Sequence, residues 1–152
     1  MVVRGIVPSD EDGYRSILER TSPEDRYCRF LHRVDHFDPA EVHRFVEARD
    51  DLFGVIAEED GVALGAAHAA VIDPATAELG IVVAQDARRR GIGDLLLDAL
   101  IAELQQRGFA MLVAVSLREN VPFSALARRH GLRVERAEGD ALFWQRPLTA
   151  TA

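Results

Sequence analysis

A glycine-containing turn between a strand and a helix constrains this chain more than any other segment. The turn RRRGIG (88–93) follows the apolar run 78–84 and precedes a run with helical spacing from Asp94 to Arg107. Glycines lack a Cβ, so they let a backbone turn tightly and approach a ligand closely. The free N–H groups and the positive dipole end of the following helix face the turn. The segment therefore predicts an anion site suited to phosphate.

The charge around this turn contrasts with the charge of the whole chain. Segment 85–93 carries a net charge of +2, from three arginines and Asp86, whereas the formal net charge of the chain is −7. Guanidinium groups can bind phosphate oxygens in pairs. An acidic protein with one basic loop suits a specific small anion, and it disfavours nucleic acid as a partner because a broad basic surface is missing.

Length and composition predict one soluble domain. The chain has 152 residues, of which 48% are hydrophobic and 28% charged, and it has no repeats or long linkers. We expect a domain over 1–148 and a short tail over 149–152. No run approaches the roughly 20 apolar residues of a membrane span, and the N-terminus lacks the features of a signal peptide. With no membrane partner expected and a single cysteine, Cys28, we expect a cytoplasmic location.

Apolar periodicity and turn residues predict an α/β chain with a mixed sheet. Two segments, SDED (9–12) and SPED (22–25), each place a capping residue and an acidic first turn at a helix start. The expected elements, in order, are strand Val2–Val7, helices from Ser9 to about Arg20, Ser22 to about His32 and Asp38 to about Arg49, strands Leu52–Glu58, Val62–Ile72 and Ala77–Ala84, helix Asp94–Arg107, strand Met111–Ser116, helix Asn120–His130, and strands Leu132–Arg136 and Ala141–Gln145.

Two common phosphate loops do not match the turn. A dinucleotide fingerprint, G-x-G-x-x-G, would need glycine or alanine where Leu96 stands, and a Walker loop has no match. The pattern [Q/R]-x-x-G-x-[G/A] does match, through Arg88, Gly91 and Gly93. Between a Val-rich strand and an amphipathic helix, it resembles the acyl-CoA-binding motif of the GCN5-related N-acetyltransferases (GNAT family). A basic surface turn that merely caps a helix is the alternative.

The resemblance extends over nearly the whole predicted order of elements. It implies a single-domain mixed sheet flanked by helices, with a splayed central strand pair, and acetyl-CoA as co-substrate. It also implies that backbone groups of one strand bind the pantetheine arm and thioester, that the turn binds pyrophosphate, and that an asparagine contacts the arm or simply caps its helix. The residues in these positions are Ile81, Val82, Val83, Arg88, Arg89, Arg90, Gly91, Ile92, Gly93, Asp94 and Asn120.

Two positions bear on catalysis by resemblance. Glu78 begins the apolar strand where many family members have a glutamate that acts as general base; a solvated carboxylate at a strand end is the alternative. Ala127 stands where many members have a tyrosine that protonates the leaving thiolate. Another donor, water or direct loss of the thiolate would replace it, and a non-catalytic acyl-CoA-binding module stays open. The possible donors are Tyr14, Tyr27, Ser116 and Ser124.

A second resemblance concerns the acceptor. The segment SPEDRYCRF (22–30) is similar to the S-x-E-S-x-Y-x-R-F segment of bacterial protein-lysine acetyltransferases, with Asp25 in place of the second serine. It favours a protein lysine as the acceptor. A small-molecule amine is the second candidate, and a structural domain whose arginines bind an acidic surface is a third hypothesis. Monomer and homodimer both stay open.

The remaining reactive side chains predict little chemistry. His32, His36 and His43 lack the spacing of a zinc site, so no metal is expected. Cys28 has no neighbouring histidine or asparagine signature, and we expect it to be a small buried side chain rather than a nucleophile.

Overall fold

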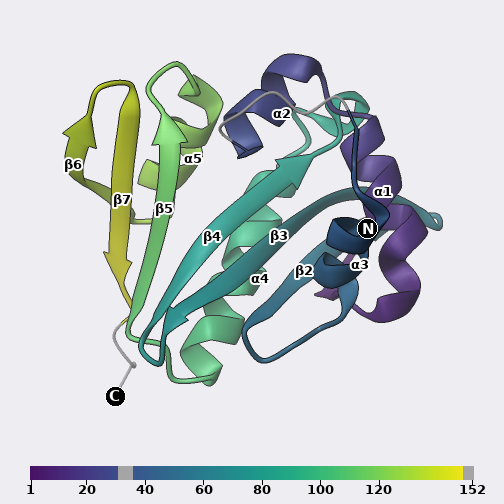
Figure 1. Cartoon of the computed structure of the whole chain (residues 1–152), viewed down its shortest axis with the longest axis horizontal. Helices are drawn as coiled ribbons and strands as arrows, with labels where there is room; N and C mark the ends of the chain where they lie inside the picture. Colours follow the sequence, from purple (N-terminus) through teal and green to yellow (C-terminus); the bar gives the residue numbers. More distant parts are fainter. Residues whose placement is uncertain (31–35, 149–152) are drawn as a thin grey trace.

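The structure is a computed structural model that describes residues 1–30 and 36–148. The expected end of the second helix near His32 and the expected tail 149–152 lie outside these residues. The described part follows the predicted order of elements (Figure 1). Its elements are β1 (Val2–Gly5), a 3₁₀ turn (Pro8–Asp10), α1 (Glu11–Glu19), α2 (Pro23–Phe30), α3 (Pro39–Val46), β2 (Leu52–Glu59), β3 (Val62–Asp73), β4 (Thr76–Val83), a 3₁₀ turn (Gln85–Ala87), α4 (Ile92–Gln106), β5 (Met111–Leu117), α5 (Val121–Arg129), β6 (Arg133–Glu138) and β7 (Ala141–Pro147).

The described strands form one sheet in the order β1-β2-β3-β4-β5-β7-β6. Neighbouring strands are antiparallel except β4 and β5, which are parallel. Helix α4 is the crossover between these two strands, because a parallel connection must return the chain to the same end of the sheet. The prediction of an α/β chain with a mixed sheet is confirmed.

The β4–β5 pair opens into a splay. Its register consists of three residue pairs, Thr76–Met111, Ala77–Leu112 and Glu78–Val113. On its other edge β4 stays paired with β3 as far as Val83. Figure 1 shows β4 and β5 diverging toward the end where α2 and α5 lie. The expected splay is thus confirmed, and it leaves one edge of residues 79–83 facing a gap in the sheet.

Helices cover the sheet on both faces and divide the core into two clusters. The larger cluster joins α4 and α5 to one face; Ile92, Leu96, Leu100 and Leu104, predicted from their spacing, are all buried in it. The smaller cluster joins α1 and α3 to the other face and contains Val82 of β4. Alternate residues of β4 therefore face different cores, as strand geometry requires.

The predicted end of the third helix and the predicted start of the first helix were wrong. The third helix ends at Val46 rather than near Arg49, because Ala48 adopts a positive φ of 56° and Arg49 forms an isolated bridge with Leu52. The first helix was expected to start at Ser9 with a cap and an acidic first turn, but it begins at Glu11, and the side chain of its N-cap residue, Asp10, makes no capping bond. It instead accepts hydrogen bonds from the Arg4 guanidinium, at 2.8 Å, and from the Val7 N–H, at 2.8 Å.

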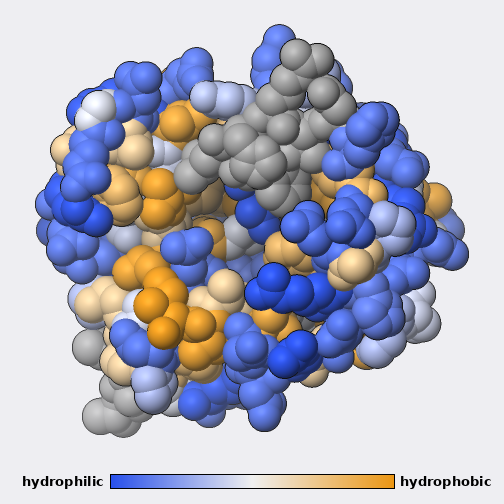
Figure 2. Space-filling model, in the orientation of Figure 1, coloured by the Kyte–Doolittle hydropathy of each residue, from blue (hydrophilic) through white to orange (hydrophobic). Residues whose placement is uncertain are grey.

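The outer half of the sheet is more open than the half near the N-terminus. In Figure 2 apolar residues on this face gather over β4, β5 and β7. Val113, Val115 and Phe143, at alternate positions of β5 and β7, are only half-buried. Across residues 1–30 and 36–148, no helix is long and apolar enough to cross a membrane.

The Arg4–Asp10 contact makes stability depend on pH. Hydrogen bonds from Arg4 hold the pKa of Asp10 below its usual value. The ionised carboxylate therefore stabilises the fold above the unfolded pKa of about 3.9, and this contribution is lost as the pH falls through the lower folded value. Asp10→Asn should lower the free energy of unfolding by about 1–3 kcal/mol at pH 7. Urea titrations should show this difference shrinking below about pH 4; a constant difference would contradict the assignment.

Candidate functional site

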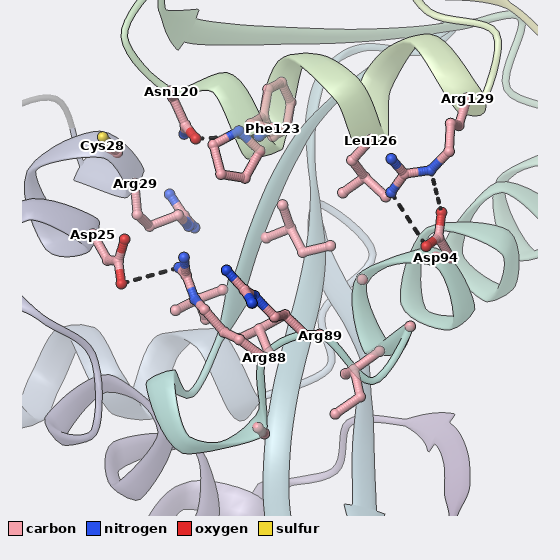
Figure 3. A pocket seen from close by; sticks show the side chains of 18 residues that line it. Asp25, Cys28, Arg29, Arg88, Arg89, Asp94, Asn120, Phe123, Leu126 and Arg129 are labelled. Carbon is pink, nitrogen blue, oxygen red and sulfur yellow. Dashed lines mark hydrogen bonds and ion pairs between the residues drawn. The ribbon is translucent and has the colours of Figure 1, made fainter.

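A cavity of about 560 Å³ lies where β4 and β5 diverge. Helix α2, the end of β4, the turn before α4 and helix α5 line it (Figure 3). Every residue predicted to bind the cofactor lines the cavity, except Arg90. The fold thus brings together segments up to about 100 residues apart in the chain, and the splay provides the space between them.

The turn before α4 has the backbone shape of an anion site. Gly91 is the N-cap of α4 with a φ of 75°, and a Cβ added there would meet no atom within 4 Å. Arg89 also has a positive φ, 64°, which is rare for a residue with a side chain and often marks functional backbone. The open approach over Gly91 and the N-terminus of a 15-residue helix together fit a bound phosphate.

The charges of the cavity favour an anion. Among the described residues, its lining includes two carboxylates and the four arginines Arg29, Arg88, Arg89 and Arg129. Both carboxylates are already paired: one with Arg88, at 3.0 Å, and the other with Arg129, at 3.1 Å. These carboxylates belong to Asp25 and Asp94, respectively.

Arg90, in contrast, points away from the cavity. Its guanidinium binds the carboxylate of Glu59, at the end of β2, with a distance of 2.6 Å. The structure therefore separates it from the other two arginines of the turn.

Sequence reasoning missed Arg29. This residue of α2 lies over β4, so close that a Cβ added to Gly80 would stand 2.5 Å from its Nη2. Gly80 was the available signal, because a glycine inside an apolar strand often marks the close approach of another group. In Figure 3 the Arg29 side chain projects into the space between α2 and α5.

Comparison with known proteins identifies this arrangement. The model of the Acetyltransferase (GNAT) family matches residues 14–132, most of the chain. The chain belongs to the GNAT acetyltransferase family. The match spans α1 to the end of α5 and so contains every element that lines the cavity.

Solved structures share the GNAT fold. The GNAT domain of S. lividans PAT is 23% identical, with a TM-score of 0.88 over 95% of this chain and 89% of that one. The yncA protein of Salmonella typhimurium, solved with its cofactor acetyl-CoA, is 23% identical, with a TM-score of 0.79 over 100% and 96%. The PaiA N-acetyltransferase of Thermoplasma acidophilum, in complex with coenzyme A, is 14% identical, with a TM-score of 0.78 over 97% and 99%.

The predicted GNAT base, Glu78, stands at the apex of the splay. It belongs to the last β4–β5 register pair and is exposed. It is not among the residues that line the cavity; instead it lies two residues before Gly80 on the same face of β4. Asn120, the predicted contact to the arm, lines the cavity and also caps α5, since its Oδ1 accepts a hydrogen bond from the Phe123 N–H at 3.2 Å.

The position of the usual GNAT tyrosine cannot present a hydroxyl here. Ala127 is fully buried in the larger core cluster, under α5. Of the possible proton donors, Tyr14, Ser116 and Ser124 are buried, and Ser116 Oγ accepts a hydrogen bond from Trp144. Tyr27 is the exposed one, at 44%.

A second, smaller cavity adjoins the first at the α2 end. Asp25, Cys28, Asn120 and Pro122 line both. The second cavity adds three further side chains that suit a cationic or aliphatic guest, Glu24, Tyr27 and Glu119.

The prediction that Cys28 is buried was wrong, because the side chain is half-exposed between these cavities. Burial and the nearby Glu119 and Asp25 raise the pKa of its thiol, which disfavours a nucleophilic thiolate. Among the described residues, no group of three or more His, Cys, Asp or Glu side chains could hold a metal ion.

One ion cluster fixes α5 against the start of α4. Asp94 accepts hydrogen bonds from Arg129 Nε, at 3.1 Å, and is 2.7 Å from His130 Nε2. The other ring nitrogen of His130 lies 3.1 Å from Asp98. This cluster closes the side of the cavity opposite α2 and orients the first turn of α4.

The cluster predicts a measurable titration. Hydrogen bonds from Arg129, and then from His130, lower the pKa of Asp94. Arg129→Gln should raise that pKa toward the ordinary value of about 3.9, as followed by NMR of the carboxyl carbon. Arg128→Gln is the matched control, because Arg128 lies over the Trp144 ring instead. An equal shift in both variants would contradict the contact.

Proposed function

We propose that this protein transfers the acetyl group of acetyl-CoA to the side-chain amine of a protein lysine. The use of acetyl-CoA as the donor is supported by the turn 88–94. This turn combines an open αL glycine, a helix N-terminus and arginines at the mouth of a cavity in the splay. Family membership and the ligands of the two neighbours support acetyl-CoA as the occupant. In this proposal the pyrophosphate binds Arg88, Arg89 and the N-terminal turn of α4.

The backbone of β4 holds the reacting end. On the edge that faces β5, residues 79–83 lie beyond the last register pair. The N–H and C=O groups of the alternate residues that point toward β5 are therefore available for the amides of the pantetheine arm and the thioester carbonyl. Ile81, Val82 and Val83 line the cavity at this place and exclude water. Preorganised backbone donors aimed at a carbonyl oxygen are an effective way to stabilise developing charge.

The acceptor approaches from the smaller cavity. Glu24, Asp25 and Glu119 make that cavity acidic, and Tyr27 offers an exposed aromatic face beside them. A lysine side chain has a cationic head on an aliphatic stem, which suits such a surface. Its ammonium must lose a proton before it can attack, since its ordinary pKa is about 10.4. Glu78, exposed at the apex of the splay, is the proposed base.

Acetyl-CoA binding can be tested at Gly91 with a strain-matched control. Gly91 and Gly61, in the β2–β3 turn, have φ values of 75° and 78°, and an added Cβ meets no atom within 4 Å at either. Gly91→Val and Gly61→Val should therefore destabilise the fold similarly. Titration calorimetry should show that only Gly91→Val loses acetyl-CoA binding, because its branched Cβ occupies the phosphate approach. Unchanged affinity in folded Gly91→Val would contradict the proposed site.

Acetyl transfer is tested with lysine peptides and mass spectrometry. The protein should acetylate the ε-amine, and it should prefer basic flanking residues because the smaller cavity is acidic. Glu78→Gln should lower kcat by about 10²–10⁴-fold while the Kd of acetyl-CoA stays constant. Glu135→Gln, an exposed glutamate on the edge strand β6, is the control.

The alternatives have distinct outcomes in the same experiment. Product from a panel of small amines, with none from peptides, would support a small-molecule acetyltransferase. Acetyl-CoA binding with no acetylated product in any arm would support a non-catalytic acyl-CoA-binding module. If the Glu78→Gln variant turns over at the wild-type rate, the proposed acetyl transfer stands, but Glu78 is not its base.

A further inference from the structure

The Arg29 side chain packs against β4 at Gly80, where the missing Cβ leaves room for it. A Cβ at residue 80 would stand 2.5 Å from its Nη2 and 2.7 Å from its Cζ, so the guanidinium lies directly against the backbone of Gly80. Gly80 directly precedes Ile81, the first residue of β4 that lines the large cavity, and Arg29 itself lines that cavity. A guanidinium is therefore held beside the strand segment to which the reacting thioester is assigned.

A cluster of aromatic rings packs against the Arg29 guanidinium. Its Cζ lies 5.9 Å from the centre of the Phe45 ring, which packs edge-on against His68 at 4.9 Å, and Tyr14 packs against both rings. His68 pairs with Gly80 across the β3–β4 register, and its ring nitrogen Nε2 is 2.9 Å from the Phe45 carbonyl. A carbonyl only accepts, so Nε2 carries a proton and donates it in this hydrogen bond.

The titratable groups around Arg29 hold their charge states near neutral pH. Burial, followed by the charge of Arg29, lowers the pKa of His68 to about 3, so it carries no charge. Burial raises the pKa of Tyr14, and it also raises that of the Cys28 thiol, so both stay protonated. Other charged groups of the described residues in this region are Asp25 and Arg88, bound to each other at 3.0 Å, and Glu78 on the same face of β4.

We propose that Arg29 is a catalytic residue of the acetyl transfer, whose guanidinium stabilises the negative charge that departs with the sulfur of coenzyme A. This inference rests on the proposed function. Ala127 is fully buried where many relatives have a proton-donating tyrosine, so the departing sulfur meets no phenol from α5. A guanidinium is a poor acid and does not replace the proton donor, but it stabilises an adjacent anion.

The step balances without a further reactant. The amine nitrogen forms a bond to the carbonyl carbon, and the carbon–sulfur bond breaks with its electron pair on sulfur. The proton of the amine passes to Glu78 and from there to solvent. Coenzyme A leaves as a thiolate paired with Arg29 and takes its proton from water after it leaves the site.

The test measures the Kd of coenzyme A and of acetyl-CoA by calorimetry between pH 7 and 9.5. A cation within about 4–6 Å lowers the pKa of an acidic group by about 1–3 units, so the wild type should bind coenzyme A at least about tenfold more tightly at the alkaline end. Acetyl-CoA carries the same phosphates but no free thiol. Its affinity should not show this rise, which also controls for titration of Cys28.

Three variants assign the effect to Arg29. Arg29→Gln should abolish the alkaline rise and lower kcat by about 10²-fold, the usual loss for one electrostatic donor. Gly80→Ala should do the same while Arg29 is retained, because the new Cβ displaces the flexible end of the guanidinium. Arg89→Gln, in the phosphate turn, should weaken both ligands at every pH and leave the alkaline rise intact.

The outcomes separate this proposal from the proposed function. If acetyl-CoA does not bind the wild type, the acetyltransferase proposal fails. If it binds and is turned over, but the affinities of both ligands change in parallel with pH, Arg29 does not stabilise the thiolate. Wild-type kcat in Arg29→Gln, or an intact alkaline rise in folded Gly80→Ala, would equally overturn the role of Arg29.

Discussion

The separation of β4 from β5 after three residue pairs is the constraint on which the site depends. A continuous sheet would bury the backbone of residues 79–83 in strand pairing, and it would bring α2 and α5 too close for a cavity. The splay is maintained from both sides. Strand β5 pairs with β7 along its whole length, and β4 pairs with β3 as far as Val83. Each strand is thus stabilised by its outer neighbour, so the gap does not leave either strand without a ladder.

The shape of the turn before α4 and most of the fold could be predicted because their signals are local. Two glycines, the flanking periodicities and the caps at Asp38 and Asn120 lie within a few residues of the structures that they determine. The apolar spacing of α4 likewise fixed its buried face. The splay between the two central strands was predicted from the family resemblance, because no local pattern in the sequence indicates it.

The features that escaped prediction depend on contacts between distant segments. Arg90 carries the same charge as its neighbours in the turn, yet Glu59 draws it away from the cavity. Arg29 lies about 50 residues before the glycine that accommodates it. In each case a partner far away in sequence decides the direction of a charged side chain, and composition cannot identify that partner.

The ion pair between Arg88 and Asp25 links the two cavities. Arg88 belongs to the turn before α4, whereas Asp25 lines both the large cavity and the smaller cavity beside it. An anion that binds Arg88 would compete with Asp25 for the guanidinium. The Asp25 carboxylate would then be available to a cation in the smaller cavity. In the proposed function, binding of acetyl-CoA would thereby strengthen the attraction of this carboxylate for a cationic amine. The proposed reaction would then follow an order of binding in which the acetyl donor enters before the amine.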